Sequence, residues 1–156
     1  YKILHLATHG YIDNDIPEMS AIVLSQDSEN INDINDGYLN ISEISDLNLE
    51  SNLVVLSACN TGVGKLYHGG GVMNVANSFF NAGTKALMMS LWYLADNSTS
   101  LFMEEVYKKI TQDNYSYATA LNTVKREFIS GVYGEDYADT FFWAPIVYYG
   151  LDQTFN

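Results

Sequence analysis

Short apolar runs alternate along the chain with segments whose apolar residues recur at helical spacing. The clearest run, Leu53–Ala58, is apolar at nearly every position, which is typical of a parallel strand covered on both faces. Strands are predicted over residues 3–8, 21–25, 53–58, 86–92 and 141–149. Helices are predicted over residues 40–46, 72–82, 96–110 and 117–129. The alternation predicts the α/β class, with a mostly parallel sheet and helices on both faces.

Local signals define several boundaries of these elements. Asn40 is expected to cap the first helix, and Gly83 is expected to end the second. Pro145 predicts an edge position or a bulge for the last strand, because proline cannot donate to a strand ladder.

The third predicted helix carries its own cap and charge pattern. The residues Asp96–Ser98 are expected to cap it. Glu104 stands four residues before Lys108 and Glu105 four before Lys109, so two favourable ion pairs are expected along the helix.

Composition narrows the class of protein. The net charge is −12 with only 7 basic residues, which argues against nucleic-acid binding. No apolar run approaches the roughly 18 residues of a membrane span. A single Cys cannot form an internal disulfide and favours a reducing, cytoplasmic setting. The 156 residues suit one globular domain, residues 1–156.

The first strand opens the chain directly. Residue 1 is Tyr rather than Met, so we expect this sequence to be the C-terminal part of a longer protein. Without earlier strands, residues 3–8 would form an exposed apolar edge. We therefore predict that upstream residues complete the sheet.

His9 and Cys59 each follow an apolar run, where parallel strands deliver side chains to one edge of a sheet. An adjacent imidazole lowers the pKa of a thiol and can protonate a leaving amine. The backbone N–H groups of Gly10 and Cys59 could stabilise an oxyanion. The blander interpretation remains open, because a free Cys is often a small buried hydrophobe and a strand-end His is often structural.

The order of these two residues favours one class of cysteine peptidase. Papain-like enzymes place Cys first, whereas caspases place His about 50 residues before an Ala-Cys motif. Here His9 precedes Cys59 by about that distance, and Ala58 precedes the Cys.

Several motifs in this order resemble the CHAT family of caspase-like domains over nearly the whole chain. They are His5-Leu-Ala-Thr-His-Gly10, Asp36-Gly-Tyr-Leu39, Leu53-Val-Val-Leu-Ser-Ala-Cys-Asn-Thr-Gly62, Gly71-Val-Met73, Ala82-Gly83, Ser90-Leu-Trp92 and Phe142-Trp-Ala-Pro145. The resemblance implies a caspase-like three-layer sandwich and a His/Cys dyad on His9 and Cys59. It also implies cleavage of a partner protein, frequent fusion to tetratricopeptide repeats and, in some prokaryotic members, a role in defence.

The chain departs from these families at two positions. Gly70 stands where CHAT domains often have Glu. Ser57 stands two residues before the Cys, where caspases carry the Gln that holds a substrate Asp and some relatives that cleave after Arg or Lys carry Asp. A small neutral Ser57 predicts a neutral or apolar residue before the cut. Asp96, just beyond a strand, could supply a negative wall and reverse that preference.

His5 is not expected to form a metal site with His9. On one strand His5 and His9 would lie about 13 Å apart, too far to share a zinc ion, so His5 is expected to be a core histidine and no metal or cofactor is expected.

Three functions stay open: a cysteine endopeptidase, a silent caspase-like module that docks a partner, and a hydrolase or transferase using Cys59 on a small acyl group.

Overall fold

The computed structural model describes residues 1–156 except 12, 14, 26–35, 58–70 and 93–94. A four-stranded sheet runs in the order β1-β5-β6-β7, with β1 (Ile3–Leu6), β5 (Leu53–Leu56) and β6 (Ala86–Ser90) parallel and β7 (Ile146–Gly150) antiparallel. A small antiparallel sheet contains β2 (His9–Tyr11), β3 (Ala21–Val23) and β4 (Tyr38–Asn40).

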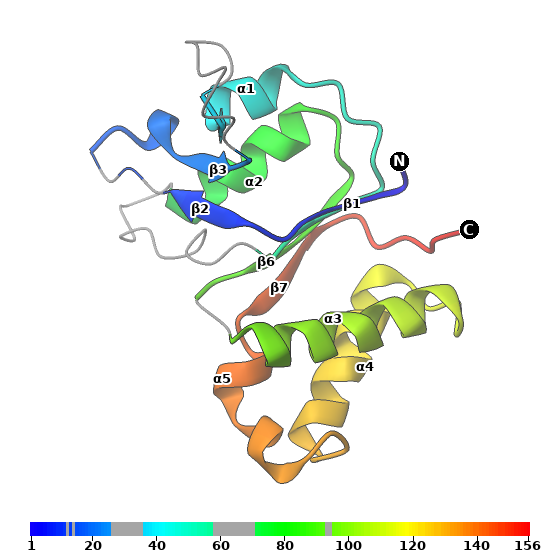
Figure 1. Ribbon diagram of the computed structural model, residues 1–156. Helices are drawn as coiled ribbons and strands as arrows, with labels where there is room; N and C mark the ends of the chain where they lie inside the picture. The colour runs from blue at the N-terminus through cyan, green and yellow to red at the C-terminus, as the bar shows by residue number, and fades with distance from the viewer. Residues whose placement is uncertain (12, 14, 26–35, 58–70, 93–94) are drawn as a thin grey trace.

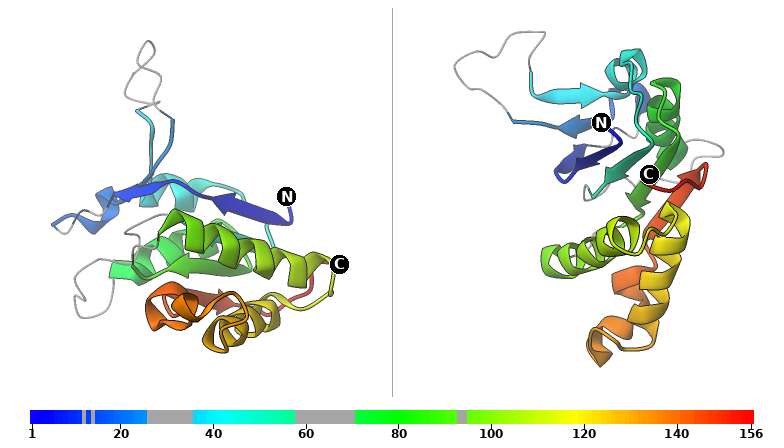
Figure 2. Two further views of the ribbon diagram at one scale, coloured as in Figure 1. Left: turned by 60° about the horizontal axis from the view of Figure 1, so that its bottom comes forward. Right: turned by 90° about the vertical axis from the view of Figure 1, so that its right-hand side faces the viewer.

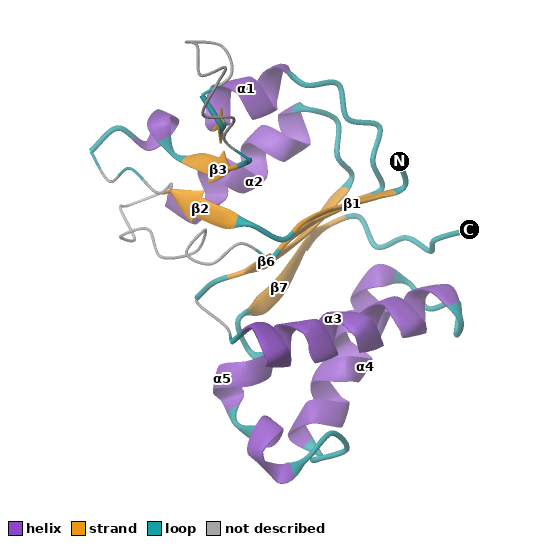
Figure 3. Ribbon diagram, viewed as in Figure 1, coloured by secondary structure: helices purple, strands orange, loops and turns teal. Residues whose placement is uncertain are grey.

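Helices cover both faces of the larger sheet. On one face lie α1 (Ile41–Asp46) and α2 (Gly71–Asn81), with the small sheet beside them (Figures 1 and 3). On the other lie α3 (Asp96–Thr111), α4 (Tyr117–Ile129) and α5 (Thr140–Trp143), as the turned views also show (Figure 2). Short 3-10 turns occupy Pro17–Met19 and Glu135–Ala138. The predicted α/β class, mostly parallel sheet and layered arrangement are confirmed.

Strands β5 and β6 explain why two cores form. Successive side chains of a strand point to opposite faces, and every residue of both strands is buried. Leu53 and Val55 join the core under α3 and α4, whereas Val54 and Leu56 join the core under α1 and α2. The uninterrupted apolar run therefore stabilises both layers at once.

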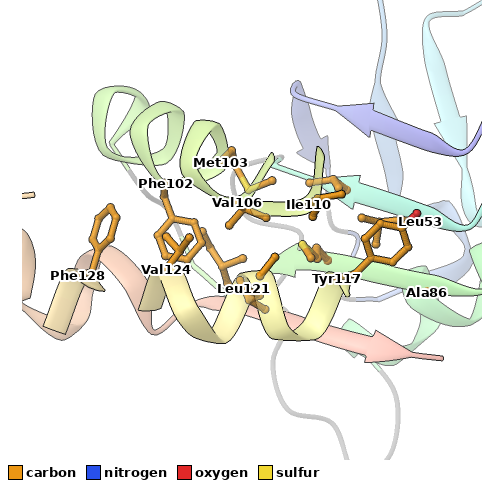
Figure 4. Packing of buried hydrophobic residues seen from close by; sticks show 14 residues of the cluster. Leu53, Ala86, Phe102, Met103, Val106, Ile110, Tyr117, Leu121, Val124 and Phe128 are labelled. Carbon is orange, nitrogen blue, oxygen red and sulfur yellow. The ribbon is translucent and has the colours of Figure 1, made fainter. Parts of the chain in front are cut away.

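The core under α3 and α4 is built mainly from two helical stripes (Figure 4). Phe102, Val106 and Ile110 recur four residues apart on α3 and are fully buried. Leu121, Val124 and Phe128 face them from α4. Phe102 and Phe128 pack with ring centroids 5.0 Å apart.

Several predicted boundaries are confirmed. Asn40 caps α1 through a capping box with Glu43, in which each residue's side chain accepts from the other's backbone N–H. Helix α4 spans Tyr117–Ile129 as predicted. Gly83 follows α2 with φ +101°, and a Cβ there would lie 2.7 Å from the carbonyl oxygen of Leu49. Only glycine fits such a close left-handed turn.

The first predicted strand extends too far at its C-terminal end. Strand β1 ends at Leu6, and the chain then enters β2, so His9 opens a strand of the small sheet rather than ending β1. The strand is also only partly buried, because among the described strands it pairs with β5 alone and forms an edge. That edge is the one expected from the sequence; the upstream strands proposed to cover it stay a prediction.

The last predicted strand is correct only in its second half. Residues 140–143 form α5, where the Asp139 side chain accepts from the N–H of Phe141. Strand β7 begins just after Pro145 and lies at the edge of the described sheet, as Pro145 indicated. Aromatic residues favour strands in isolation, but the capped turn before the proline overrides that preference.

The start and charges of α3 also differ from the prediction. Ala95 holds the N-cap position, and no side chain caps it. Lys108 pairs with both Glu104 and Glu105, at 2.8 and 2.7 Å. Lys109 instead reaches Glu127 on α4 at 2.9 Å, because that carboxylate lies across the helix pair. No helix among the described residues is long and apolar enough to cross a membrane.

Candidate functional site

A cleft of about 740 Å³ opens at the carboxyl ends of the parallel strands β1, β5 and β6. Its walls come from the strand ends, from the β1–β2 connection and from the first three turns of α3. In parallel α/β sheets such an edge is the usual place for a binding site. The described residues that line it are His5, Ala7, Thr8, His9, Ser57, Ser90, Trp92, Asp96, Thr99, Ser100, Met103, Glu104 and Tyr107.

A chain of hydrogen bonds joins three elements in this cleft. The Nε2 of His5 on β1 lies 2.6 Å from Oγ of Ser57, which follows β5. The Nδ1 of the same ring lies 2.9 Å from the hydroxyl of Tyr107 on α3. Both ring nitrogens of His5 are therefore partnered, and the imidazole is held between the sheet and the helix.

Partial burial of the two rings keeps this chain neutral, although the His5 residue as a whole is exposed in the cleft. Loss of solvent lowers the pKa of His5 below its ordinary value of 6.5 and raises the pKa of Tyr107 to about 12. At neutral pH the imidazole is then unprotonated and the phenol is protonated. The chain can carry hydrogen bonds across the cleft without carrying a charge.

The formal charges around the cleft are carboxylates. Asp96 and Glu104 line it from α3, and no Lys or Arg stands among its described lining residues. Lys108 sits 2.8 Å from Glu104 and offsets part of that charge. The opening is therefore acidic, chiefly at Asp96.

Thr8 and Ser57 fix the two chain segments that carry the predicted site. The Thr8 hydroxyl donates to the carbonyl of Val23 and ties the β1–β2 connection to β3. The N–H of Ser57 donates to the carbonyl of Leu6 at 3.1 Å and prolongs the β1–β5 pairing. His9, two residues beyond Ala7, follows the first segment into the cleft wall.

A family model of the CHAT domain matches residues 1–151. The chain belongs to the CHAT domain family. A search of curated proteins finds no match. Membership makes this a caspase-like, peptidase-related domain, and the α/β architecture agrees with it.

The CHAT domain brings three of the predicted site residues to one cleft. His9, Ser57 and Asp96 all line it, although they come from β2, the end of β5 and the start of α3. Gly10 lies beside His9 in β2, paired with Ile22 of β3. Cys59 and Gly70 lie outside the described residues, so the distance from the thiol to His9 stays a prediction.

Three cleft residues of the CHAT domain were missed or misjudged from the sequence. His5 is not a core residue: it is exposed in the cleft, although both its nitrogens are partnered. The reason is that β1 is an edge strand and His5 meets Tyr107 of α3 in the cleft. Glu104 was assigned only to an ion pair on the helix, and Tyr107 was given no role. Ser100, Glu104 and Tyr107 recur at helical spacing, which was the only sequence signal that they share a face of α3. Tyr107 lies 102 residues from His5 in sequence, so local sequence did not indicate their contact.

Proposed function

We propose that this CHAT domain is a cysteine endopeptidase that cleaves a partner protein, with Cys59 as nucleophile and His9 as acid and base. The observation that carries the proposal is that His9 and Ser57 line one cleft. Cys59 is two residues beyond Ser57. We assign the thiol to the same cleft because of this short separation in sequence.

The proposed reaction proceeds in two steps. The Cys59 thiolate attacks the scissile carbonyl, and His9, protonated by the thiol, donates its proton to the leaving amine. Water then attacks the thioester, His9 accepts a proton from that water, and the acid product leaves. Backbone N–H groups of Gly10 and Cys59 are assigned to the oxyanion.

The substrate residue before the cut is assigned to the pocket that contains Ser57 and Asp96. Ser57 carries no charge, which supports a neutral residue there. The partner would be recognised when a sensor, fused or bound, is triggered; prokaryotic defence in the cytoplasm is the setting that agrees with the family resemblance. An upstream tetratricopeptide region is the proposed form of that sensor.

Cleavage of cellular proteins tests the function. We expect new protein N-termini in cells that express the chain, and we expect their loss with Cys59→Ala and with His9→Ala. The matched control is His68→Ala, which removes a histidine that has no role in the proposed reaction. Cleavage that persists in Cys59→Ala would refute the proposal. Intact proteins together with stable partner capture would favour a docking module, and turnover of small acyl esters alone would favour the third function.

A further inference from the structure

The hydrogen-bond chain Tyr107–His5–Ser57 has a direction that its chemistry decides. A neutral imidazole offers one donor and one acceptor. A phenol is a far stronger acid than a serine hydroxyl and is therefore the better donor of the two neighbours. In the tautomer that this difference in acidity favours, the Tyr107 hydroxyl donates to Nδ1 at 2.9 Å and the Nε2–H group donates to Ser57 Oγ at 2.6 Å.

This direction leaves the hydrogen of the Ser57 hydroxyl without a partner among the described residues. His5 occupies a lone pair of Ser57 Oγ and cannot accept from it, because Nε2 carries the proton in this tautomer. Ser57 lines the cleft, so its hydroxyl can donate to a molecule bound there. Ser57 therefore offers a hydrogen-bond donor to the cleft, whereas the acidic residue Asp96 offers an acceptor.

Neither an acidic nor a basic side chain satisfies both groups. A carboxylate accepts from Ser57 but is repelled by Asp96 and Glu104. A lysine or arginine pairs with the wall but has no acceptor for the serine hydroxyl. A primary amide carries a carbonyl for Ser57 and an NH₂ group for Asp96.

We propose that the cleft binds a glutamine or asparagine side chain of the substrate, and that His5 and Tyr107 determine this specificity by orienting Ser57. The proposal rests on the proposed function in placing a peptide in the cleft. It narrows the neutral preference expected from Ser57 to an amide, and it assigns His5 and Tyr107 as positioning residues, since they act through Ser57.

Peptide binding to the Cys59→Ala form of the full chain tests the proposal without requiring cleavage. The probes are short peptides that differ at one position, which is glutamine, glutamate or lysine. We expect the glutamine peptide to bind about fivefold more tightly than either other peptide, the factor that about one net hydrogen bond supplies. Magnetic resonance of the His5 ring should show the proton on Nε2.

Two variants separate orientation from mere packing. Tyr107→Phe keeps the ring but frees Nδ1, so the preference for glutamine should fall to near one. Tyr115→Phe, in the connection between α3 and α4, removes a hydroxyl elsewhere and should leave the preference unchanged. A proton on Nδ1, equal binding of the three peptides, no binding, or tighter binding of the lysine or glutamate peptide would overturn the inference.

The outcomes distinguish this inference from the peptidase itself. Glutamine-selective binding without any cleavage in the unmodified chain would sustain the pocket and refute the peptidase. Cleavage that depends on Cys59 but follows lysine or arginine would sustain the peptidase and refute the amide pocket.

Discussion

Helix α3 has two faces that do different work. One is a stripe of apolar residues four apart, Phe102, Val106 and Ile110, which is fully buried against the sheet and α4. The other, formed by Asp96, Thr99, Ser100, Glu104 and Tyr107, lines the cleft. Apolar packing needs only shape and burial, whereas the cleft face needs partners on other elements, such as His5 for Tyr107. Stability and recognition can therefore be altered separately on one helix.

The largest effect is expected from the buried face. Phe102→Ala should lower the free energy of unfolding by about 3–5 kcal/mol, because it leaves a cavity beside Phe128. Chemical denaturation measures it. Ser100→Ala, on the cleft face of the same helix, is the matched control and should stay within about 0.5 kcal/mol of the unmodified protein. Similar losses for both would show that the two faces are not separable.

Two neighbouring glutamates sharpen the same contrast. Glu105 is 18% exposed and also accepts from Tyr133, whereas Glu104 is 60% exposed, yet both pair with Lys108. Glu105→Gln should lower the melting temperature by about 1–4 °C, since it weakens a partly buried network. Glu104→Gln should leave it nearly unchanged, as exposed pairs contribute little. Thermal unfolding of the two variants tests this prediction. A larger drop in melting temperature for Glu104→Gln would contradict this assignment of the faces.

The smallest effect concerns pH and the cleft face. The pKa of His5 is lowered by burial, so the unfolded chain binds a proton more readily than the folded one. The contribution of His5 to stability is therefore full above pH 6.5 and is lost progressively as pH falls from 6.5 to the lower folded pKa. Unfolding measured across this window should show the loss in the unmodified protein and not in His5→Gln. A loss of equal size in both would assign it to other groups.

The prediction from sequence was correct for features that depend only on residues close together in the chain. The run of apolar residues in β5, the capping box at Asn40 and the turn at Gly83 depend on neighbours in the chain, and each is present. The start of the predicted strand 141–149 forms α5 instead, because the Asp139 side chain caps that turn.

The candidate site was predictable only in part. His9, Ser57 and Asp96 were selected, and all three line the cleft, because each follows or precedes a strand that ends at this edge. The bond between His5 and Tyr107 joins residues 102 positions apart, and nothing in either local sequence indicates it. Burial of His5 was overestimated because an edge strand and an internal strand have the same apolar pattern.

Alkylation of Cys59 tests the central claim most directly. Cys59 is the only Cys in the chain, so mass spectrometry can follow its reaction with iodoacetamide across pH in the unmodified protein, in His9→Ala and in the control His68→Ala. An imidazole beside the thiol should give rapid alkylation with a midpoint well below the ordinary thiol pKa of about 8.5, lost in His9→Ala and retained in the control. The same slow rate and a midpoint near about 8.5 in all three proteins would contradict a His9–Cys59 dyad.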